Sequence, residues 1–371
     1  MTSVLIIAQS ARALAQSAVK AGWKAYAIDQ FGDLDTRAAT QHCDVVCNFS
    51  DTPTLLVVVE LLLDKHHPSA CVIGGGMESA LESLMAVNER LPFTGNSLEI
   101  YRRLCDPISF CKLLDNLGIT YPETVSDGSA ASTSGWLAKR VGGSGGGHIR
   151  PLAAGELPGD GYYRQRRVDG MSASVLFLAN GRNAQVLGYT RHWQAQPDAG
   201  RSYCRSGLIR WSAVPAPTRA QLENTVSELT LAAGLRGLCG LDFMLGDDGS
   251  IAVLEINPRP PASFELHEGE ASLLGAHRRA CDGELISPPP APASAVKASV
   301  ALYATCSLTV PAGFVWPRWC ADIPAAGTVI ERDQPVCTVM ALATSMEATQ
   351  ALAEKRLLTL LAELKNFQSI T

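Results

Sequence analysis

GLCGLDFMLGDDGSIAVLEINPRP, residues 237–260, has the composition of two β-strands joined by a tight turn. Apolar residues fill both arms, and Asp248-Gly249 between them is a strong β-hairpin signal. If these two residues form the turn, counting outward places Asp242 directly opposite Glu255, and a four-residue loop gives the same register. The hairpin therefore brings two carboxylates side by side within otherwise apolar strands.

One face of this hairpin is polar and the other is apolar. The polar face carries Asp242, Glu255 and Asn257, and the apolar face carries Leu241, Phe243 and Leu245 opposite Ile256, Leu254 and Ala252. Like charges directly across a strand pair destabilise it, so a cation is expected between the two carboxylates. Carboxylate and amide oxygens suit Mg²⁺ that bridges nucleotide phosphates, and Gly240 opposite Asn257 leaves room for a ligand. The alternative is the solvated outer face of an ordinary hairpin.

Composition limits the class of protein. The 371 residues suffice for two or three domains, and the net charge of -5 argues against nucleic-acid binding, which needs a basic surface. The apolar runs are too short for a membrane span, and the opening MTSVLIIAQSARA lacks the features of a signal peptide, so we expect a cytoplasmic protein with no membrane partner. The eleven cysteines are scattered and never spaced CxxC, which favours buried free thiols over disulfides or a zinc site.

Residues 1–97 alternate short apolar strands with helices, which predicts a doubly wound parallel-sheet domain. Asp29 ends the second strand, as a ribose-binding acid would, but the first turn, AQSARA, lacks the glycines of a dinucleotide-binding loop, and we reject that function. The GGG at 74–76 follows a strand and is either a tight turn or part of a substrate site.

The rest of the chain divides into four further segments. A connecting helical segment spans 98–135, where Asp106 is the expected N-cap, Pro107 the first helical residue and Gly118 the C-terminal cap. A nucleotide-binding domain spans 136–286 and includes a helix with a capping box from Thr218 to Gln221 and a terminal Gly234. A proline-rich linker, 287–295, precedes a small α/β subdomain, 296–371, with a last helix from about 345 to 365.

A glycine-rich loop follows a lysine on a predicted strand. Lys139 lies in WLAKR, and GGSGGG follows at 142–147. Such a loop can bring backbone N–H groups close to phosphate, although the residues after it, His148 and Ile149, are not those of a Walker loop. A mobile linker is the alternative.

Taken together, the strand lysine, the glycine loop and the acidic hairpin resemble the ATP-grasp superfamily of ligases over about residues 1–285. The resemblance implies an ATP-grasp fold, α/β and α+β, with the amino-terminal parallel-sheet domain in front. It implies that Lys139 contacts the ATP phosphates while Gly143, Ser144, Gly145 and Gly146 close over them. The adenine would be lined by Gln165, Arg166, Arg167 and Val168. Mg²⁺ or Mn²⁺ would be held by Asp242, Glu255 and Asn257. Arg259 would face the transferred phosphoryl group or the substrate carboxylate.

Two positions depart from the family pattern. Many relatives have a second phosphate-binding lysine after the aspartate that opens the connecting helix, but here Asp106 is followed by Pro107, and Lys112 comes more than a turn later. The hinge has Gln165-Arg166 where a relative often has a glutamate.

The implied reaction is ATP-dependent ligation of a small carboxylate to a small amine through an acyl phosphate. The chain looks most like the predicted ATP-dependent carboligase branch, which includes tyramine-glutamate ligase of methylofuran and methanofuran biosynthesis. A homodimer is expected, because small-molecule ligases are often dimers. The segment 189–210, rich in arginine and aromatic residues, is either part of the substrate site or surface decoration, and His192 alone is weak evidence for catalysis. The alternatives are a biotin-carboxylase-like enzyme and a non-catalytic ATP-binding regulatory subunit.

Overall fold

The computed structural model describes residues 2–131, 133–196, 203–204, 206–286 and 295–368. The expected proline-rich linker therefore lies outside the described residues, except for Ala295. Within the described ranges, no helix is both long enough and apolar enough to cross a membrane.

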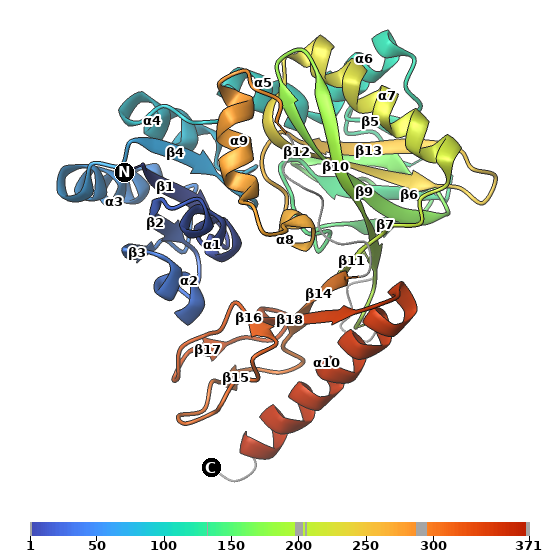
Figure 1. Cartoon of the computed structure of the whole chain (residues 1–371). Helices are drawn as coiled ribbons and strands as arrows, with labels where there is room; N and C mark the ends of the chain where they lie inside the picture. The colour runs from blue at the N-terminus through green and yellow to red at the C-terminus, as the bar shows by residue number, and fades with distance from the viewer. Residues whose placement is uncertain (1, 132, 197–202, 205, 287–294, 369–371) are drawn as a thin grey trace.

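The amino-terminal part is a four-stranded parallel sheet with helices on both faces (Figure 1). Its elements are β1 (Ser3–Ala8), α1 (Arg12–Lys20), β2 (Lys24–Asp29), α2 (Leu34–Ala39), β3 (His42–Val45), α3 (Thr52–His66), β4 (Ala70–Ile73) and α4 (Leu81–Arg90), and the strand order is β3-β2-β1-β4. Val4 and Ile6 pack in one core and Leu5 and Ile7 in another, which explains why β1 is apolar without alternation. The doubly wound arrangement expected from the sequence is confirmed.

Asp29 has a structural role at the end of β2. Its carboxylate accepts hydrogen bonds of 2.7 Å from the backbone N–H groups of Ala11, Phe31 and Gly32. These bonds involve both carboxylate oxygens and tie the segment after β1 to the turn after β2.

Two helices, α5 (Leu98–Cys105) and α6 (Pro107–Leu117), connect this domain to the rest of the chain. The caps of α6 are as expected, because the Asp106 carboxylate accepts from the Ser109 N–H at 2.7 Å and Gly118 adopts φ of 65°. Next comes a small antiparallel sheet in the order β5-β8-β6-β7, formed by β5 (Thr124–Val125), β6 (Trp136–Arg140), β7 (Arg150–Leu152) and β8 (Tyr162–Arg166).

An eight-stranded antiparallel sheet runs through the remainder of the molecule in the order β13-β12-β9-β10-β11-β14-β18-β16. Its strands are β9 (Met171–Asn180), β10 (Ala184–Trp193), β11 (Gly207–Arg210), β12 (Arg236–Leu245), β13 (Ile251–Asn257), β14 (Val296–Tyr303), β16 (Cys320–Ala321) and β18 (Pro335–Ala343). Because β14 pairs with both β11 and β18, the sheet continues across the expected boundary at residue 296.

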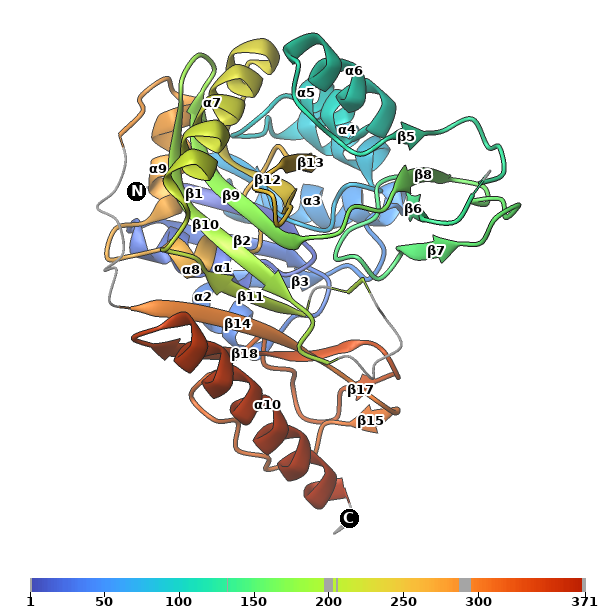
Figure 2. The same cartoon turned by 90° about the vertical axis from the view of Figure 1, so that its right-hand side faces the viewer.

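Helices cover this sheet in different places (Figure 2). The covering elements are α7 (Ala216–Ala233), α8 (Phe264–His267), α9 (Leu273–Cys281) and α10 (Met346–Gln368), and a separate pair is formed by β15 (Leu308–Thr309) and β17 (Val329–Ile330). Helix α7 packs on β9 and β10 through Leu222 and Val226, and α10 packs on β14 and β18 through Leu357 and Leu360. The capping box expected at Thr218 is wrong, since α7 begins two residues earlier after Pro215, whereas Gly234 ends it with φ of 70° as expected.

Candidate active site

The hairpin of β12 and β13 places Asp242 directly opposite Glu255 and Gly240 opposite Asn257, as the sequence predicts. The predicted turn is wrong. The Gly249 N–H donates to the Gly246 carbonyl at 2.9 Å and Gly249 has φ of 82°, so three residues, 247–249, form the loop, as in a type I turn followed by a left-handed glycine.

A bulge corrects the register before the acidic pair. Phe243 lies opposite Val253 rather than Leu254, and the pairing shifts between Asp242 and Phe243. The odd-length loop moves the register by one residue, and the extra residue at Leu254 moves it back. As a result, Ile251 and Val253 are buried beside Phe243, while Leu254 and Ala252 are only half-buried.

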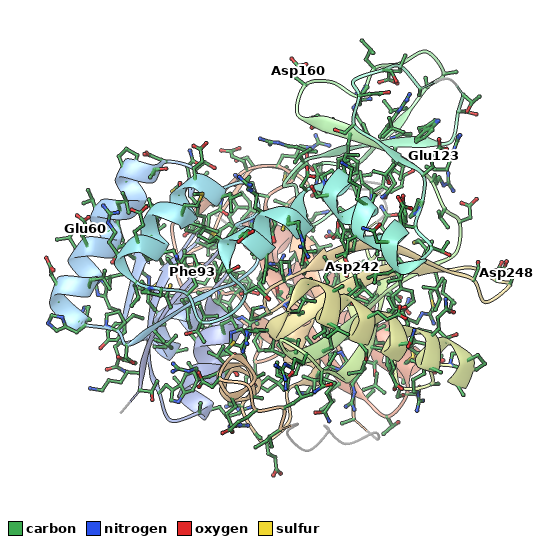
Figure 3. The ribbon with its side chains drawn as sticks, turned by 90° about the horizontal axis from the view of Figure 1, so that it is seen from above. Glu60, Phe93, Glu123, Asp160, Asp242 and Asp248 are labelled. Carbon is green, nitrogen blue, oxygen red and sulfur yellow. The ribbon has the colours of Figure 1, made fainter. Side chains whose placement is uncertain are left out.

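The carboxylate of Asp242 belongs to a polar stretch on one face of the large sheet. Asp242 pairs with Ser174 of β9, and the Ser174 and Ser172 hydroxyls lie 3.0 and 3.3 Å from the two ring nitrogens of His192 on β10. Farther along this face, Leu176, Leu178 and Leu238 lie in the core beneath α9. Figure 3 shows Asp242 in the middle of the molecule and Asp248 at the projecting tip of the hairpin. Asp242 therefore lies on this face of the large sheet where the apolar residues beneath α9 end and polar residues begin.

The space above Gly240 is not available to a ligand. A Cβ added at Gly240 would lie 3.1 Å from the Pro261 side chain, so the proline after the EINPRP segment fills the room that the sequence suggests. The glycine is needed here for close packing of the chain.

The inner face of the small sheet carries Lys139. Lys139 on β6 pairs with Tyr163 on β8, and Leu137 pairs with Gln165, so these four side chains share one face, and all four are buried. The Gln165 side-chain amide donates to the Thr124 hydroxyl at 3.1 Å. Tyr163 was not identified from the sequence, although its alternation with Gln165 along YYRQR would place it on this face.

The arginines of the expected adenine hinge lie elsewhere. The Arg166 guanidinium stacks 4.2 Å from the centre of the Trp136 ring, which lies on the opposite face of the small sheet. The exposed Arg167 donates to Asp169 at 2.8 Å. Val168 is half-buried in the connection to β9. Of these four hinge residues, Gln165 places its side chain on the face with Lys139. The backbone N–H groups of Arg166 and Arg167 donate to the Glu123 and Gly135 carbonyls at 2.8 Å.

The glycine loop packs closely against neighbouring backbone. Gly142, Gly145 and Gly146 have φ between 69° and 77°, and a Cβ at Gly142 would lie 3.0 Å from the Glu78 carbonyl oxygen. Ser144 is exposed, and its carbonyl accepts a 3.3 Å hydrogen bond from the His148 ring, which packs against Gly143. Burial lowers the pKa of His148, with Glu255 acting in the opposite direction and Lys139 in the same one. His148 therefore lies within electrostatic reach of both the hairpin acid and the strand lysine.

Arg259 is buried in an ion pair that the sequence did not predict. Its Nε donates to the Glu78 carboxylate at 2.8 Å, and a second guanidinium N–H donates to the same oxygen. Burial acts to lower the pKa of Arg259, but Glu78, Tyr101 and Cys105 together act more strongly in the other direction, and the net pKa is raised. The second oxygen of Glu78 is buried beside this pair and has no hydrogen-bond partner in the described part of the chain. The Tyr101 hydroxyl is buried close to the Arg259 guanidinium. Glu78 follows the GGG turn, and only its acidic character next to that turn could have pointed to it.

Residues 105–263 match the sequence model of the ATP-grasp domain family. This chain has the ATP-grasp fold. The L-amino acid ligase of Bacillus licheniformis superposes with a TM-score of 0.70 at 15% identity, covering 96% of this chain and 96% of the other. The biotin carboxylase domain of the Hydrogenobacter thermophilus 2-oxoglutarate carboxylase, a dimer solved in complex with MgADP, superposes with a TM-score of 0.72 at 15% identity, covering 94% of this chain and 87% of the other.

A local sequence match agrees with the ATP-grasp fold. The D-alanine–D-alanine ligase of Desulfovibrio desulfuricans is 44% identical over 66 residues, which is 16% of this chain. The match spans 22% of that ligase, about a fifth of its length.

The side-chain oxygens on the polar face of the β12–β13 hairpin are of the type that would suit Mg²⁺, with the remaining ligands supplied by a nucleotide. Asp242 and Glu255 are opposed across one strand pair, and the amide of Asn257 lies on the same face. Among the described residues, no group of three or more histidines, cysteines or acids is arranged to hold a metal by itself. Mg²⁺ is usually held by one or two carboxylates together with phosphate and water oxygens, which matches this incomplete protein set.

Proposed function

We propose that this chain is an ATP-dependent ligase that joins a small carboxylate to a small amine through an acyl phosphate. One observation carries the proposal. The register of β12 and β13 puts Asp242 opposite Glu255, and the neighbouring segments bring groups that suit phosphate chemistry: a strand lysine, a glycine loop and a buried arginine. The matched ATP-grasp domain and the ligase-like neighbours support it.

Each residue has a separate task in this reaction. Asp242, Glu255 and Asn257 would hold Mg²⁺, which neutralises phosphate charge when it is bound. Lys139 would orient the phosphates of ATP, with the backbone N–H groups of Gly143 to Gly146 closing over them. Gln165 and the backbone of residues 166–168 would contact the adenine. The Hydrogenobacter domain binds MgADP, which supports the same cofactor pair here.

Arg259 would act on the reacting carboxylate. Its guanidinium presents a fixed set of N–H donors, and it stays charged because Glu78 is its buried partner. The carboxylate oxygen attacks the γ-phosphoryl group, ADP leaves, and the acyl phosphate forms. The amine then attacks the acyl carbon and releases phosphate, giving an amide. The closed glycine loop would keep water away from the acyl phosphate.

The first pair of substrates that we propose is glutamate and tyramine, in the biosynthesis of a methylofuran-type or methanofuran-type cofactor. This choice comes from the resemblance of the sequence to the carboligase branch. We also propose a homodimer, which is supported by the dimeric state of the Hydrogenobacter domain.

Phosphate release from ATP, measured over a matrix of small acids and amines with mass spectrometry of the products, tests the proposal. Ligation predicts release that needs one acid and one amine together and yields the amide. Release that depends on bicarbonate would favour carboxylation instead, which the similarity to the biotin carboxylase domain makes the second candidate. Tight ATP binding without release under any combination would contradict both activities and leave a regulatory subunit.

A further inference from the structure

A cavity of about 300 Å³ lies between the amino-terminal sheet and the glycine loop. Gln9, Gln30, Asn48 and Gly76 line it, and they come from the segments that follow β1, β2, β3 and β4. All four parallel strands thus contribute to it at their carboxyl ends. This is where open α/β sheets bind ligands, next to the position where the strand order changes direction.

The opposite wall of the cavity comes from the nucleotide-binding domain. Arg140, next to Lys139 on β6, lines it together with Gly142, Gly143 and His148. Since Arg140 directly follows Lys139 on β6, this wall belongs to the same strand and glycine loop that carry the proposed phosphate-binding groups. The cavity and the proposed phosphate site therefore share the glycine loop as a common wall.

The charges of the cavity wall select the ligand. Among the described residues that line the cavity, Arg140 is the only one with a permanent charge, and none is acidic. Besides the His148 ring and the Cys47 thiol, the polar lining side chains are amides and hydroxyls. The Ser50 hydroxyl already donates to the Ser79 carbonyl at 3.3 Å, and Gln30 gives one amide N–H to the Cys47 carbonyl at 3.4 Å. The Asn48 side-chain oxygen accepts from the Ser50 N–H at 3.0 Å, which leaves the amide N–H groups of Asn48 as donors. A wall with one cation, no acid and the amide N–H groups of Asn48 as donors favours an anion.

We propose that this cavity binds the acid substrate, and that this acid is a small dicarboxylate whose non-reacting carboxylate is held by Arg140. The inference rests on the proposed ligase function, because it assumes that the other carboxylate is phosphorylated. The volume lies at the lower end of the range for small-molecule sites, so it suits a short dicarboxylate better than a peptide. An acid without the second carboxylate would leave Arg140 without its ligand and should bind more weakly.

Cys47 gives a direct measure of occupancy. Its exposed thiol lines the cavity, whereas Cys306, also exposed, follows β14 in the carboxyl-terminal part and is absent from the cavity wall. The rate of alkylation of each cysteine by iodoacetamide can be followed by peptide mass spectrometry. The ligands are the dicarboxylates from malonate to adipate and glutamate, with butyrate and pentanoate as matched monocarboxylates, all with ADP and Mg²⁺ present.

We expect at least one dicarboxylate to slow alkylation of Cys47 about fivefold or more while Cys306 is unaffected and the monocarboxylates have no effect. Arg140→Gln should abolish this protection, and the same substitution at the exposed Arg182, in the loop between β9 and β10, should preserve it. Loss of protection in Arg140→Gln alone would show that ligand binding in the cavity requires the positive charge of Arg140.

Three results would overturn the proposal. They are equal protection by the monocarboxylates, no protection by any acid, and full protection by ADP and Mg²⁺ alone, which would make the cavity part of the nucleotide site. None of these requires turnover. A ligase that releases phosphate but shows no protection of Cys47 would therefore retain the proposed function and lose this inference, and protection without phosphate release would do the reverse.

Discussion

Arg259 and Glu78, which are 181 positions apart in the sequence, form a buried ion pair between two parts of the molecule. Glu78 follows the GGG turn after β4 of the amino-terminal sheet, and Arg259 follows β13 of the hairpin that carries the acidic pair. The side chains are only 9% and 10% exposed, so water can replace neither partner. The pair fixes the direction of the guanidinium and ties the hairpin to the loop beside the proposed acid site.

Removing the charge of Glu78 should destabilise the protein. Glu78→Gln leaves a buried guanidinium without its counter-ion, and breaking such a pair costs about 3 kcal/mol of unfolding free energy. Urea unfolding at pH 7 measures the loss. Glu89→Gln is the matched control, because Glu89 pairs with Arg90 at a side-chain exposure of 75%, and its loss should stay within about 0.5 kcal/mol. Equal stability of the two variants would show that the buried pair is energetically unimportant.

The hairpin acids should be needed for metal binding and not for folding. Glu255→Gln and Asn257→Ala should each lower the affinity for Mn²⁺ in the presence of a nonhydrolysable ATP analogue by more than about a hundredfold, because each removes or neutralises an oxygen ligand. Electron paramagnetic resonance of free Mn²⁺ reports binding without turnover. Asp248→Asn, at the exposed tip of the same hairpin, should bind Mn²⁺ normally. Normal affinity in Glu255→Gln would remove the metal assignment.

Lys139 should contribute to nucleotide affinity. A charge-assisted hydrogen bond to phosphate contributes about 1.5 to 3 kcal/mol, so Lys139→Ala should weaken binding of a nonhydrolysable ATP analogue by about ten- to a hundredfold. Isothermal titration calorimetry measures this, and binding of adenosine, which lacks phosphates, should change little. Lys24→Ala, on the exposed start of β2, is the control for a lost lysine. A variant at position 139 that loses adenosine as strongly as the triphosphate would indicate a structural role for Lys139.

Features with a local cause were predictable from the sequence. The cap of α6 at Asp106 and the parallel strands beginning with SVLIIA follow from residue types within one or two turns of chain. The opposition of Asp242 and Glu255 was also predicted, but its prediction depended on a turn that the protein does not use. The three-residue loop and the bulge at Leu254 displace the register by one residue in opposite directions. The two displacements cancel, so the predicted pairing of Asp242 with Glu255 holds although the predicted turn does not.

Features that depend on distant segments were not predictable. The partner of Arg259 comes from another domain, and no pattern within EINPRP specifies it. Pro261 fills the space over Gly240 because the chain turns back after β13, which alternation along the strand does not reveal. The segment 189–210, which the sequence left open, is described only in part, since residues 197–202 and 205 lie outside the described ranges.

The stability of the fold should decrease on acidification through His277, a buried residue of α9. Its Nδ1 accepts from the Leu238 N–H at 2.8 Å, and its Nε2 faces the Thr94 carbonyl at 3.0 Å, so the ring is neutral with its proton on Nε2. A second proton would have to sit on Nδ1, against an N–H donor. Burial lowers the pKa of His277 to about 4, with the Thr94 carbonyl opposing this and Arg278 adding to it.

The direction of the pH effect on stability follows from how many protons His277 binds in the folded and in the unfolded state. In the unfolded chain a histidine titrates near pH 6.5, so below that pH the unfolded state binds a proton that the folded state does not accept until about pH 4. Stability is therefore complete above pH 6.5 and falls as the pH decreases toward 4. Between pH 7 and pH 5 the loss from this group is about 2 kcal/mol.

Urea unfolding at pH 7 and pH 5 isolates this contribution when the wild type is compared with His277→Gln. Glutamine can accept from Leu238 and donate to Thr94, and it does not titrate, so the pH-dependent loss should be about 2 kcal/mol smaller in the variant even if the variant is less stable overall. His267, whose pKa burial lowers to about 3, acts in the same direction in both proteins and cancels in the comparison. The same pH dependence in wild type and His277→Gln would mean that His277 takes up its proton equally in the folded and unfolded states.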